Sequence, residues 1–410
     1  MAPFSRHLRL LFLATALVVA AFSTGISFLF FLVYLTAAIL IGCWFYARGG
    51  LRSVRADYRV LNPRTHVGEV LQAIYRVENP DRFAKPSIEL WNDSTMPTGL
   101  PGRVLGVPAR GARQWVAKVR LTRRGSYRLG ALRVRTGDPF GLFTTEMMVG
   151  QATSVVVFPE VVTLPQWRLP PSPLDGTARM RRRYEAATPL VTGVRAYNHG
   201  DAINRIHWPS TARHGELHVK EFDFEQAADL WMVLDLDRSV HAGVGADASV
   251  EVAVTVAASI AMRTLADNRS VAMTASARRL QLHQPDRGPR VEQKLLHLLA
   301  NVQADGSTPL AEVLNATLPQ LRRGVTLCII TGSTDRTWVR SLSALRRRGV
   351  GALVILLDRR SYIGVEPDEH ARAELGAVQH ALAEYGIEHR PVRRGDDIAE
   401  AIGGRGRARV

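Results

Sequence analysis

Cysteine is scarce in this sequence, which has two among 410 residues: Cys43 in an apolar segment and Cys328 in a strand-like run. Two such cysteines provide no disulfide framework, which argues against a small disulfide-stapled domain and fits a reducing compartment. Hydrophobic residues make up 46% and charged residues 22%, so disorder is excluded for most of the length. A chain of this size can form two or three domains with a sizeable buried core.

Acidic residues are also in short supply, 37 against 53 basic ones, which leaves a formal charge of +16 at pH 7. A basic excess suggests nucleic acid or an anionic membrane surface as a partner. Here the excess is mostly arginine spread over the whole length. The distribution therefore argues against nucleic acid.

Charge is missing altogether between Leu10 and Ala47, a run of 38 residues. As one helix the run would measure about 57 Å, nearly twice a hydrocarbon core of about 30 Å. It therefore predicts a transmembrane helical hairpin over residues 1–50, with helices at about 10–24 and 26–47 and a turn at Ser23-Thr24-Gly25.

Arginines flank both ends of this run and none lies in the turn. By the positive-inside tendency, both ends and the soluble domains are expected on the cytoplasmic side of the cell (inner or plasma) membrane. The alternative is a signal peptide cleaved near Ala21-Phe22-Ser23, after which the second apolar stretch would still anchor the product. The lipid bilayer is a predicted partner in both cases.

The stretch from 51 to 164 has no long helical periodicity. Period-two alternation recurs in "VLQAIYRVEN", "ARQWVAKVRLT", "YRLGALRVRT" and "SVVVFP", separated by Gly, Pro, Asn and Asp. This pattern predicts a β-sandwich-like domain, with "GDPFGLF" as one of its corners. Its polar positions offer no catalytic cluster.

Residues 165–228 are predicted to form a connector, rich first in proline and then in arginine between Arg179 and Arg183. Its second half is dense in Arg, Lys, Asp, Glu and His around Trp208. We expect the charges to form a paired network and Trp208 to be buried as an anchor. Zinc is disfavoured because His214 and His218 alone have a short spacing, and Gly215 between them opposes a helix that holds both on one face.

From 229 to 404 the pattern becomes strand, helix, strand. Apolar strands such as "LWMVLDLD", "VTLCIITG" and "ALVILLD" alternate with amphipathic helices such as "ASVEVAVTVAASIAMRTLADN". This predicts a doubly wound α/β domain with a mainly parallel sheet, followed by a basic tail at 405–410. The whole chain is thus expected to be a membrane-anchored α+β multidomain protein.

"VLDLDRS", Val233 to Ser239, lies where such a domain binds ligands, at the carboxyl end of a strand. In extended chain Asp235, Asp237 and Ser239 project to one side. The later "DGSTPLAEVL" could bring Thr308 to the same edge. Carboxylates and hydroxyls are hard oxygen ligands, so Mg²⁺ or another divalent cation is the candidate cofactor, although no cofactor is certain.

This domain resembles a von Willebrand factor A domain, whose metal site uses Asp-x-Ser-x-Ser, a later Thr and often a further Asp. Asp235, Ser239 and Thr308 match that pattern. Asp237 replaces the first Ser, and Gly332 stands where the last Asp is expected. The resemblance therefore implies a degenerate metal-ion-dependent adhesion site.

The wider chain is similar to a bacterial membrane-anchored family known as domain of unknown function 58. The similarity is carried by "RGSYRLGALRV", "DPFGLF" and above all "RAYNHGDAINRIHWPSTARHGELHVKE". The signature positions that match include Arg195, Tyr197, Gly200, Asp201, Arg205, Trp208 and Arg213. His207 and Pro209 depart from the pattern, where Asp and Lys are usual. The resemblance implies neighbours of the MoxR-type AAA+ ATPase and transglutaminase-like membrane protein classes.

Three functions follow as hypotheses. The first is a non-enzymatic, membrane-tethered adaptor that presents its A-like domain to a protein partner, for which a MoxR-type ATPase is the candidate. The second is a metal-dependent hydrolase with Asp235 and Asp237 on the ion and His207 or His199 as base. The third is binding of nucleic acid or lipid through the connector arginines and the tail. No catalytic residue is assigned, because no motif pairs a nucleophile with a base.

Overall fold

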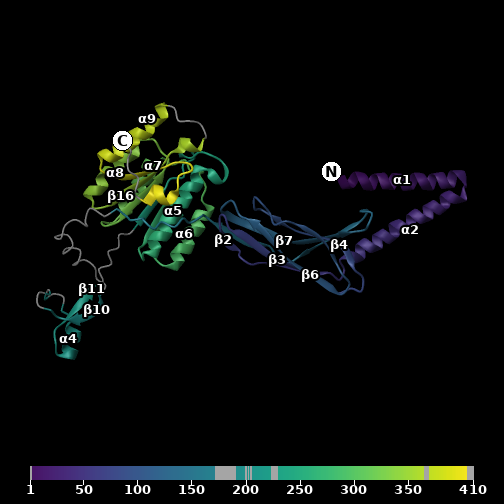
Figure 1. The fold of residues 1–410 in the computed structure, drawn as a ribbon, viewed down its shortest axis with the longest axis horizontal. Helices are drawn as coiled ribbons and strands as arrows, with labels where there is room; N and C mark the ends of the chain where they lie inside the picture. The colour runs from purple at the N-terminus through teal and green to yellow at the C-terminus, as the bar shows by residue number, and fades with distance from the viewer. Residues whose placement is uncertain are drawn as a thin grey trace. The chain divides into compact units, whose positions relative to one another are not determined.

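The computed structural model of the chain describes residues 2–170, 191–198, 201, 203, 206–222, 230–363 and 369–403. It is a mixed α/β protein with several sheets and an apolar helix near the N-terminus, as the sequence predicts at that level. Two compact units make up the chain, Met1–Phe158 and Pro159–Val410 (Figure 1).

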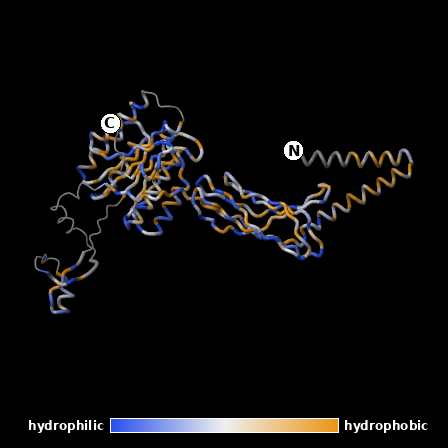
Figure 2. Tube along the Cα trace, in the orientation of Figure 1, coloured by the Kyte–Doolittle hydropathy of each residue, from blue (hydrophilic) through white to orange (hydrophobic). Residues whose placement is uncertain are grey.

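The first unit begins with two apolar helices that contact each other, α1 (Ala2–Thr24) and α2 (Ser27–Gly50). Between them Gly25 has φ +68°, a left-handed conformation that glycine adopts without steric cost. Phe22 and Phe30 pack edge to face across the turn, with ring centroids 5.2 Å apart. Figure 2 shows the apolar character of α2 along its length.

Two helices of the described chain are long and apolar enough to cross a membrane. One is Ser27–Gly50. The other, Ser249–Ala266, is half-buried in the second unit, as expected of a core helix. Phe12–Thr24 is a shorter apolar helix.

The rest of the first unit is a sandwich of two sheets. One sheet has the order β1-β3-β6 and the other β2-β9-β7-β4-β5, with β8 paired to β7. The strands are β1 (Arg55–Val60), β2 (Arg64–His66), β3 (Val70–Asn79), β4 (Lys85–Ser94), β5 (Arg103–Val107), β6 (Gly111–Arg120), β7 (Gly125–Gly137), β8 (Thr144–Val149) and β9 (Thr153–Phe158). Buried residues of β3 and β6 share one core with those of β4, β7 and β9. Alternation along each strand sends every second side chain into that core.

A six-stranded sheet forms the centre of the second unit, in the order β14-β13-β12-β15-β16-β17. The strands are β12 (Leu230–Leu234), β13 (Val271–Ser276), β14 (Leu280–Asp286), β15 (Thr326–Thr331), β16 (Gly351–Leu357) and β17 (Glu388–Val392). All pair in parallel except β14, which is antiparallel at the edge. The sequence order changes direction between β12 and β15, so the topological switch point lies there.

Helices cover both faces of this sheet (Figure 1). They are α5 (Ser249–Ala266), α6 (Pro289–Asn301), α7 (Leu310–Thr317), α8 (Thr337–Arg347), α9 (Glu369–Glu384) and α10 (Ile398–Gly403). Trp231 and Val233 of β12 share a core with α7, α8 and α9. The alternate side chains of β12 point to the opposite face, and α5 contacts β12, β13 and β15. Being covered on both faces explains why the strands are continuously apolar.

The segment Pro159–Pro170 belongs to the second unit, so the division falls earlier than the predicted boundary at 164. Leu164 and Trp167 are buried, and the guanidinium of Arg390 lies 5.1 Å from the centroid of the Trp167 ring. The backbone N–H of Val162 donates to Ser259 Oγ at 2.9 Å. The burial of Leu164 and Trp167 stabilises the packing of this segment against the α/β unit.

The signature region of the predicted connector contains regular structure. β10 (Val191–Ala196) pairs antiparallel with β11 (His218–Phe222), and the short helix α4 (Trp208–His214) lies between them in sequence. We call these three elements the signature hairpin. Gly215, with φ +73°, ends α4 directly after His214, as its position in the sequence predicts.

Candidate functional site

Asp235 follows β12 directly and is fully buried at the switch point. Its Oδ2 accepts a hydrogen bond from Thr331 Oγ1 at 2.7 Å, which bridges the ends of β12 and β15. Its Oδ1 accepts from the backbone N–H of Asp237 at 3.2 Å and from Ser276 Oγ at 3.4 Å. Burial raises the pKa of Asp235 to about 6, although these three donors oppose the shift.

Asp237 and Ser239 do not continue the strand. Oδ1 of Asp237 accepts the backbone N–H of Ser239 at 2.8 Å and starts a 3-10 turn at Arg238–Val240. Asp235 is therefore buried, Asp237 half-buried and Ser239 exposed. The prediction that all three project to one side of an extended chain is wrong, because the aspartate caps a turn instead.

The loop that carries Thr308 does reach this edge. Gly306 forms a parallel bridge with Asp237, and its N–H donates to Leu236 O at 3.1 Å. A Cβ on Gly306 would lie 2.2 Å from Ser276 O, so only glycine allows this approach. Thr308 itself is exposed. The loop of Thr308 is thus brought to the residues that follow β12.

Gly332 occupies the position where the A-domain resemblance expects an aspartate. An ideal Cβ there would lie 2.4 Å from Val240 O and 3.5 Å from Leu357 O, both backbone atoms. The turn that Asp237 caps and the end of β16 therefore occupy the space that a side chain would need. At Gly332 the packing of the strand ends leaves no room for the aspartate that the A-domain pattern expects.

Ser276 and Thr331 were not identified from the sequence, yet they hold the Asp235 carboxyl. Each is the last residue of an apolar strand that neighbours β12. The sequence did carry one signal for them: each is a hydroxyl residue at the end of an apolar, strand-like run. Which runs neighbour one another could not be read from the sequence.

A hollow lies at the carboxyl ends of β12, β15 and β16. One cavity of ≈ 260 Å³ is lined by residues that follow β12, β15 and β16, among them Ser239, Gly332, Asp335, Asp358 and Arg360. A second of ≈ 610 Å³ shares Thr334, Asp335 and Glu374 with it and runs between α8 and α9. We call the two together the strand-end hollow. Arg336, Arg340 and Arg359 are exposed at its walls.

The strand-end residues fit a resident divalent ion poorly. Asp235 is sealed from solvent and its oxygens accept from hydroxyl and amide donors. Asp237 then remains as the sole carboxylate of the predicted set with any exposure, beside the hydroxyls of Ser239 and Thr308. Within the described residues no group of three or more His, Cys, Asp or Glu could hold a metal. A hard cation prefers more anionic oxygen than this.

The signature hairpin contains one strong charge pair. Arg195 donates through both guanidinium nitrogens to the two oxygens of Asp201 at 2.8 Å, and Asp201 also accepts the N–H of Asn198. Tyr197 N–H donates to Leu217 O at 2.8 Å. Gly200 and Arg205 lie outside the described residues. This bidentate pair ties Asp201 to the end of β10.

Trp208 is 63% exposed, so the prediction that it is a buried anchor is wrong. It opens α4, where Pro209 follows it and His207 caps the helix. A helix of two turns has too small an inner face to cover an indole. Arg213 is also exposed, in the last turn of α4, where a cation favours the helix dipole.

The candidate histidines have other roles. Nδ1 of His207 lies 2.8 Å from Ser210 Oγ and accepts the Ser210 N–H, so the ring caps α4. His214 and His218 have ring centroids 5.2 Å apart, and His218 Nδ1 lies 2.8 Å from Glu216 O. His199 is outside the described residues.

Comparison with known sequences places part of this chain in context. Residues 193–363, which contain all of the signature hairpin except Val191 and Thr192 together with the strand-end residues, match the model of the family described as "Protein of unknown function DUF58". Uncharacterized protein Rv1480 of Mycobacterium tuberculosis is 28% identical over 50% of the chain. Uncharacterized protein YeaD of Bacillus subtilis is 22% identical over 61% of it. The chain spans 65% and 60% of the length of these two relatives.

Solved structures resemble only parts of the chain. The CARDB domain of a Pyrococcus furiosus protein covers 25% of the chain and 91% of its own length, with 14% identity and a TM-score of 0.19. Proximal thread matrix protein 1 of the mussel byssus covers 43% of the chain and 44% of its own length, with 14% identity and a TM-score of 0.28. At these scores the likeness carries no inference on function.

Proposed function

We propose that the chain is a membrane-tethered, non-enzymatic adaptor that presents a von Willebrand factor A-like domain, residues 229–404, to a protein partner. The strand-end hollow carries this proposal. It lies at the switch point of a sheet covered on both faces, where α/β domains bind their ligands. The Asp235 carboxyl at the same strand ends is held in hydrogen bonds and buried, so it is not exposed to a substrate.

The hollow is lined by both signs of charge: Arg336, Arg340, Arg359 and Arg360 lie among Asp335, Asp358, Glu374 and Glu384. In this proposal its exposed arginines bind an acidic segment of a protein. On one side, exposed Arg336 precedes α8 and exposed Arg340 lies in its first turn; on another, Arg359 follows β16. Planar guanidinium groups suit bidentate pairing with carboxylates. The family resemblance supplies the candidates, a MoxR-type AAA+ ATPase first and a transglutaminase-like membrane protein second.

The tether in this proposal is the N-terminal pair of helices in the cell membrane, with the soluble units in the cytoplasm. Support comes from α2, which has the length and composition of a spanning helix, and from Arg48 and Arg52 after its apolar stretch. A hydrolase finds less support, because His207 is engaged as a helix cap. The arginines at 179–183 and 405–410 lie outside the described residues.

Site-specific cross-linking tests the adaptor proposal. A photoreactive amino acid at Thr334, in the hollow, is expected to capture an AAA+ ATPase in cells of the source organism, identified by mass spectrometry of the adduct. The matched control is Arg322, which is exposed at the opposite end of β15. Equal capture at both positions, or capture of no AAA+ ATPase at Thr334, would contradict the proposal.

Magnesium titration tests whether an ion takes part. Because Asp235 is sealed and Asp237 is the one partly exposed carboxylate of the set, we expect calorimetry to give no Mg²⁺ binding tighter than about 1 mM. Asp235→Ala should leave the weak heats unchanged. Saturable micromolar binding that Asp235→Ala abolishes would instead establish an ion site.

A further inference from the structure

One face of α2 is buried against the sandwich near the end of the helix. Cys43, Ala47 and Gly50 are its buried residues, and their spacing of four and three places them on one face. α2 contacts β7 and β8, and a Cβ on Gly50 would lie 2.5 Å from Thr136 Cγ2. The hairpin β7–β8 therefore runs beside the last two turns of α2.

The tip of that hairpin reaches Cys43. Asp138 is buried and accepts the backbone N–H groups of Phe140 and Phe143 at 2.9 and 2.5 Å, which fixes the turn "DPFGLF". The Asp138 carboxylate also interacts with the Cys43 thiol. Cys43 precedes Gly50 by seven residues, a rise of about 10 Å along the helix. The hairpin tip thus lies about 10 Å from the C-terminal end of α2, toward the middle of the helix.

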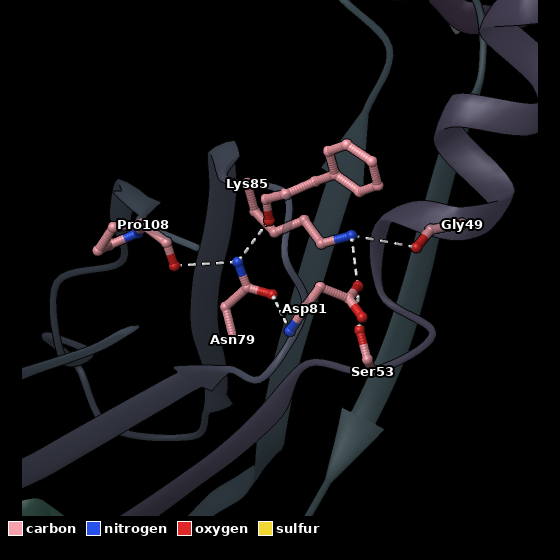
Figure 3. Close-up of polar contacts among 7 residues, drawn as sticks. Gly49, Ser53, Asn79, Asp81, Lys85 and Pro108 are labelled. Carbon is pink, nitrogen blue, oxygen red and sulfur yellow. Dashed lines mark hydrogen bonds and ion pairs between the residues drawn. The ribbon is translucent and has the colours of Figure 1, made fainter. Parts of the chain in front are cut away.

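A second contact holds the end of α2 to the loop between β3 and β4 (Figure 3). Lys85 Nζ donates to Gly49 O at 3.4 Å and pairs with Asp81 at 3.1 Å. Asp81 also accepts from the Ser53 hydroxyl. Asn79 braces the loop from within, donating to Phe83 O at 2.8 Å and Pro108 O at 3.0 Å. The loop Pro80–Ala84 is therefore fixed beside the end of α2.

Helix length then sets the depth of the hairpin tip. The 16 residues from Ser27 to Gly42 rise about 24 Å, short of a hydrocarbon core of about 30 Å. About 20 residues are needed, which extends the span to Tyr46. The exposed aromatic residues Trp44, Phe45 and Tyr46 match the belt that marks a membrane interface. The level of Cys43, and with it the hairpin tip, falls inside that boundary.

Both fixed loops expose a large apolar side chain. Phe140, at the hairpin tip, is 65% exposed, and Phe83, in the loop beside Gly49, is 72% exposed. Arginines lie in the same segments: Arg82 adjoins Phe83 and is exposed, as is Arg52 after α2, and the Arg48 guanidinium lies 5.1 Å from the Trp44 ring centroid. Apolar tips with nearby arginines suit the boundary between acyl chains and anionic headgroups.

We propose that the loops Pro80–Ala84 and Asp138–Phe143 form a second membrane-contact surface, in which Phe140 and Phe83 insert into the lipid–water boundary beside α2. This rests on the membrane tether proposed above. The surface continues the apolar face of α2, and its occupant is the bilayer in which α2 lies. This surface would fix the orientation of the sandwich relative to the membrane, so that Gly49-Gly50 does not act as a free hinge.

Depth-dependent quenching in the full chain tests this surface. Single cysteines at Phe140, Phe83, Leu35 and Thr122 would carry an environment-sensitive fluorophore in vesicles of phosphatidylcholine and phosphatidylglycerol. Leu35 is exposed in the middle of α2. Thr122 is exposed before the Gly125 end of β7, and that end is about 40 Å from the Gly137 end. Cys43 and Cys328 are buried, and the unsubstituted chain serves as the labelling blank.

We expect lipids that carry a nitroxide near the headgroup to quench labels at Phe140→Cys and Phe83→Cys at least twofold more than at Thr122→Cys, with aqueous iodide giving the reverse order. Labels at Phe140 and Phe83 that behave like Thr122, while a nitroxide deep on the acyl chain quenches Leu35→Cys, would overturn the surface and leave the tether intact. A Leu35 label that the deep nitroxide does not quench would overturn the tether itself.

Discussion

Aspartate in place of Gly332 is expected to destabilise the six-stranded sheet by about 2–4 kcal/mol rather than to complete a metal site. The new Cβ would lie 2.4 Å from Val240 O and 3.5 Å from Leu357 O. Backbone carbonyls cannot rotate away as a side chain could, so the turn after β12 or the end of β16 must move. A carboxylate in this buried place would also face oxygen atoms.

Hydrogen exchange of the full chain measures this effect directly. Amides of β12 and β15 should exchange faster in Gly332→Asp, with their opening free energy reduced by the amount above. Gly332→Ala tests the steric effect alone, and its opening free energy should lie between those of the unsubstituted chain and Gly332→Asp. Gly376→Asp is the matched control, since Gly376 lies in α9 with nothing within 4 Å of its Cβ position. Unchanged protection in Gly332→Asp, together with new Mg²⁺ binding, would contradict the prediction.

Strand and helix periodicity predicted much of the architecture because that information is local. "VLQAIYRVEN" is β3 residue for residue, and "ASVEVAVTVAASIAMRTLADN" contains α5. Burial on one face leaves a period of two or of 3.6 in the sequence itself. The signature hairpin was hidden because its strands are short and its charged residues mask any alternation.

The candidate site was predictable only in part, because it depends on contacts between distant residues. Asp235 was found from its place after an apolar strand, but its partners lie 41 and 96 residues away. The geometry of Asp237 was missed because a carboxylate two residues ahead of Ser239 can cap a turn as readily as it continues a strand. The crowding at Gly332 involves the carbonyl of Val240, which no local pattern reports.

The protonation of Asp235 should make the stability of the α/β unit depend on pH. Its pKa is raised to about 6 in the folded chain, chiefly by burial, against about 3.9 for an unfolded aspartate. The folded state therefore binds more protons between these values. Stability from this group is fully present below about pH 4 and is lost as pH rises through about 6, a change of about 3 kcal/mol.

Asp235→Asn should remove this dependence, since the amide is neutral throughout. Hydrogen exchange of β12 in EDTA, corrected for intrinsic rates, is expected to show the opening free energy of the variant rising relative to the unsubstituted chain by about 2 kcal/mol between pH 4 and 7. Asp335→Asn is the control, and its effect on stability should depend on pH with the opposite sign. The Thr337 hydroxyl and N–H lower the pKa of Asp335, so its contribution is lost as pH falls. A pH-independent difference for Asp235→Asn would mean that the carboxylate is already ionised when folded. Because EDTA removes divalent ions, the hydrogen bonds from Thr331, Ser276 and Asp237 would then outweigh the effect of burial on this carboxyl.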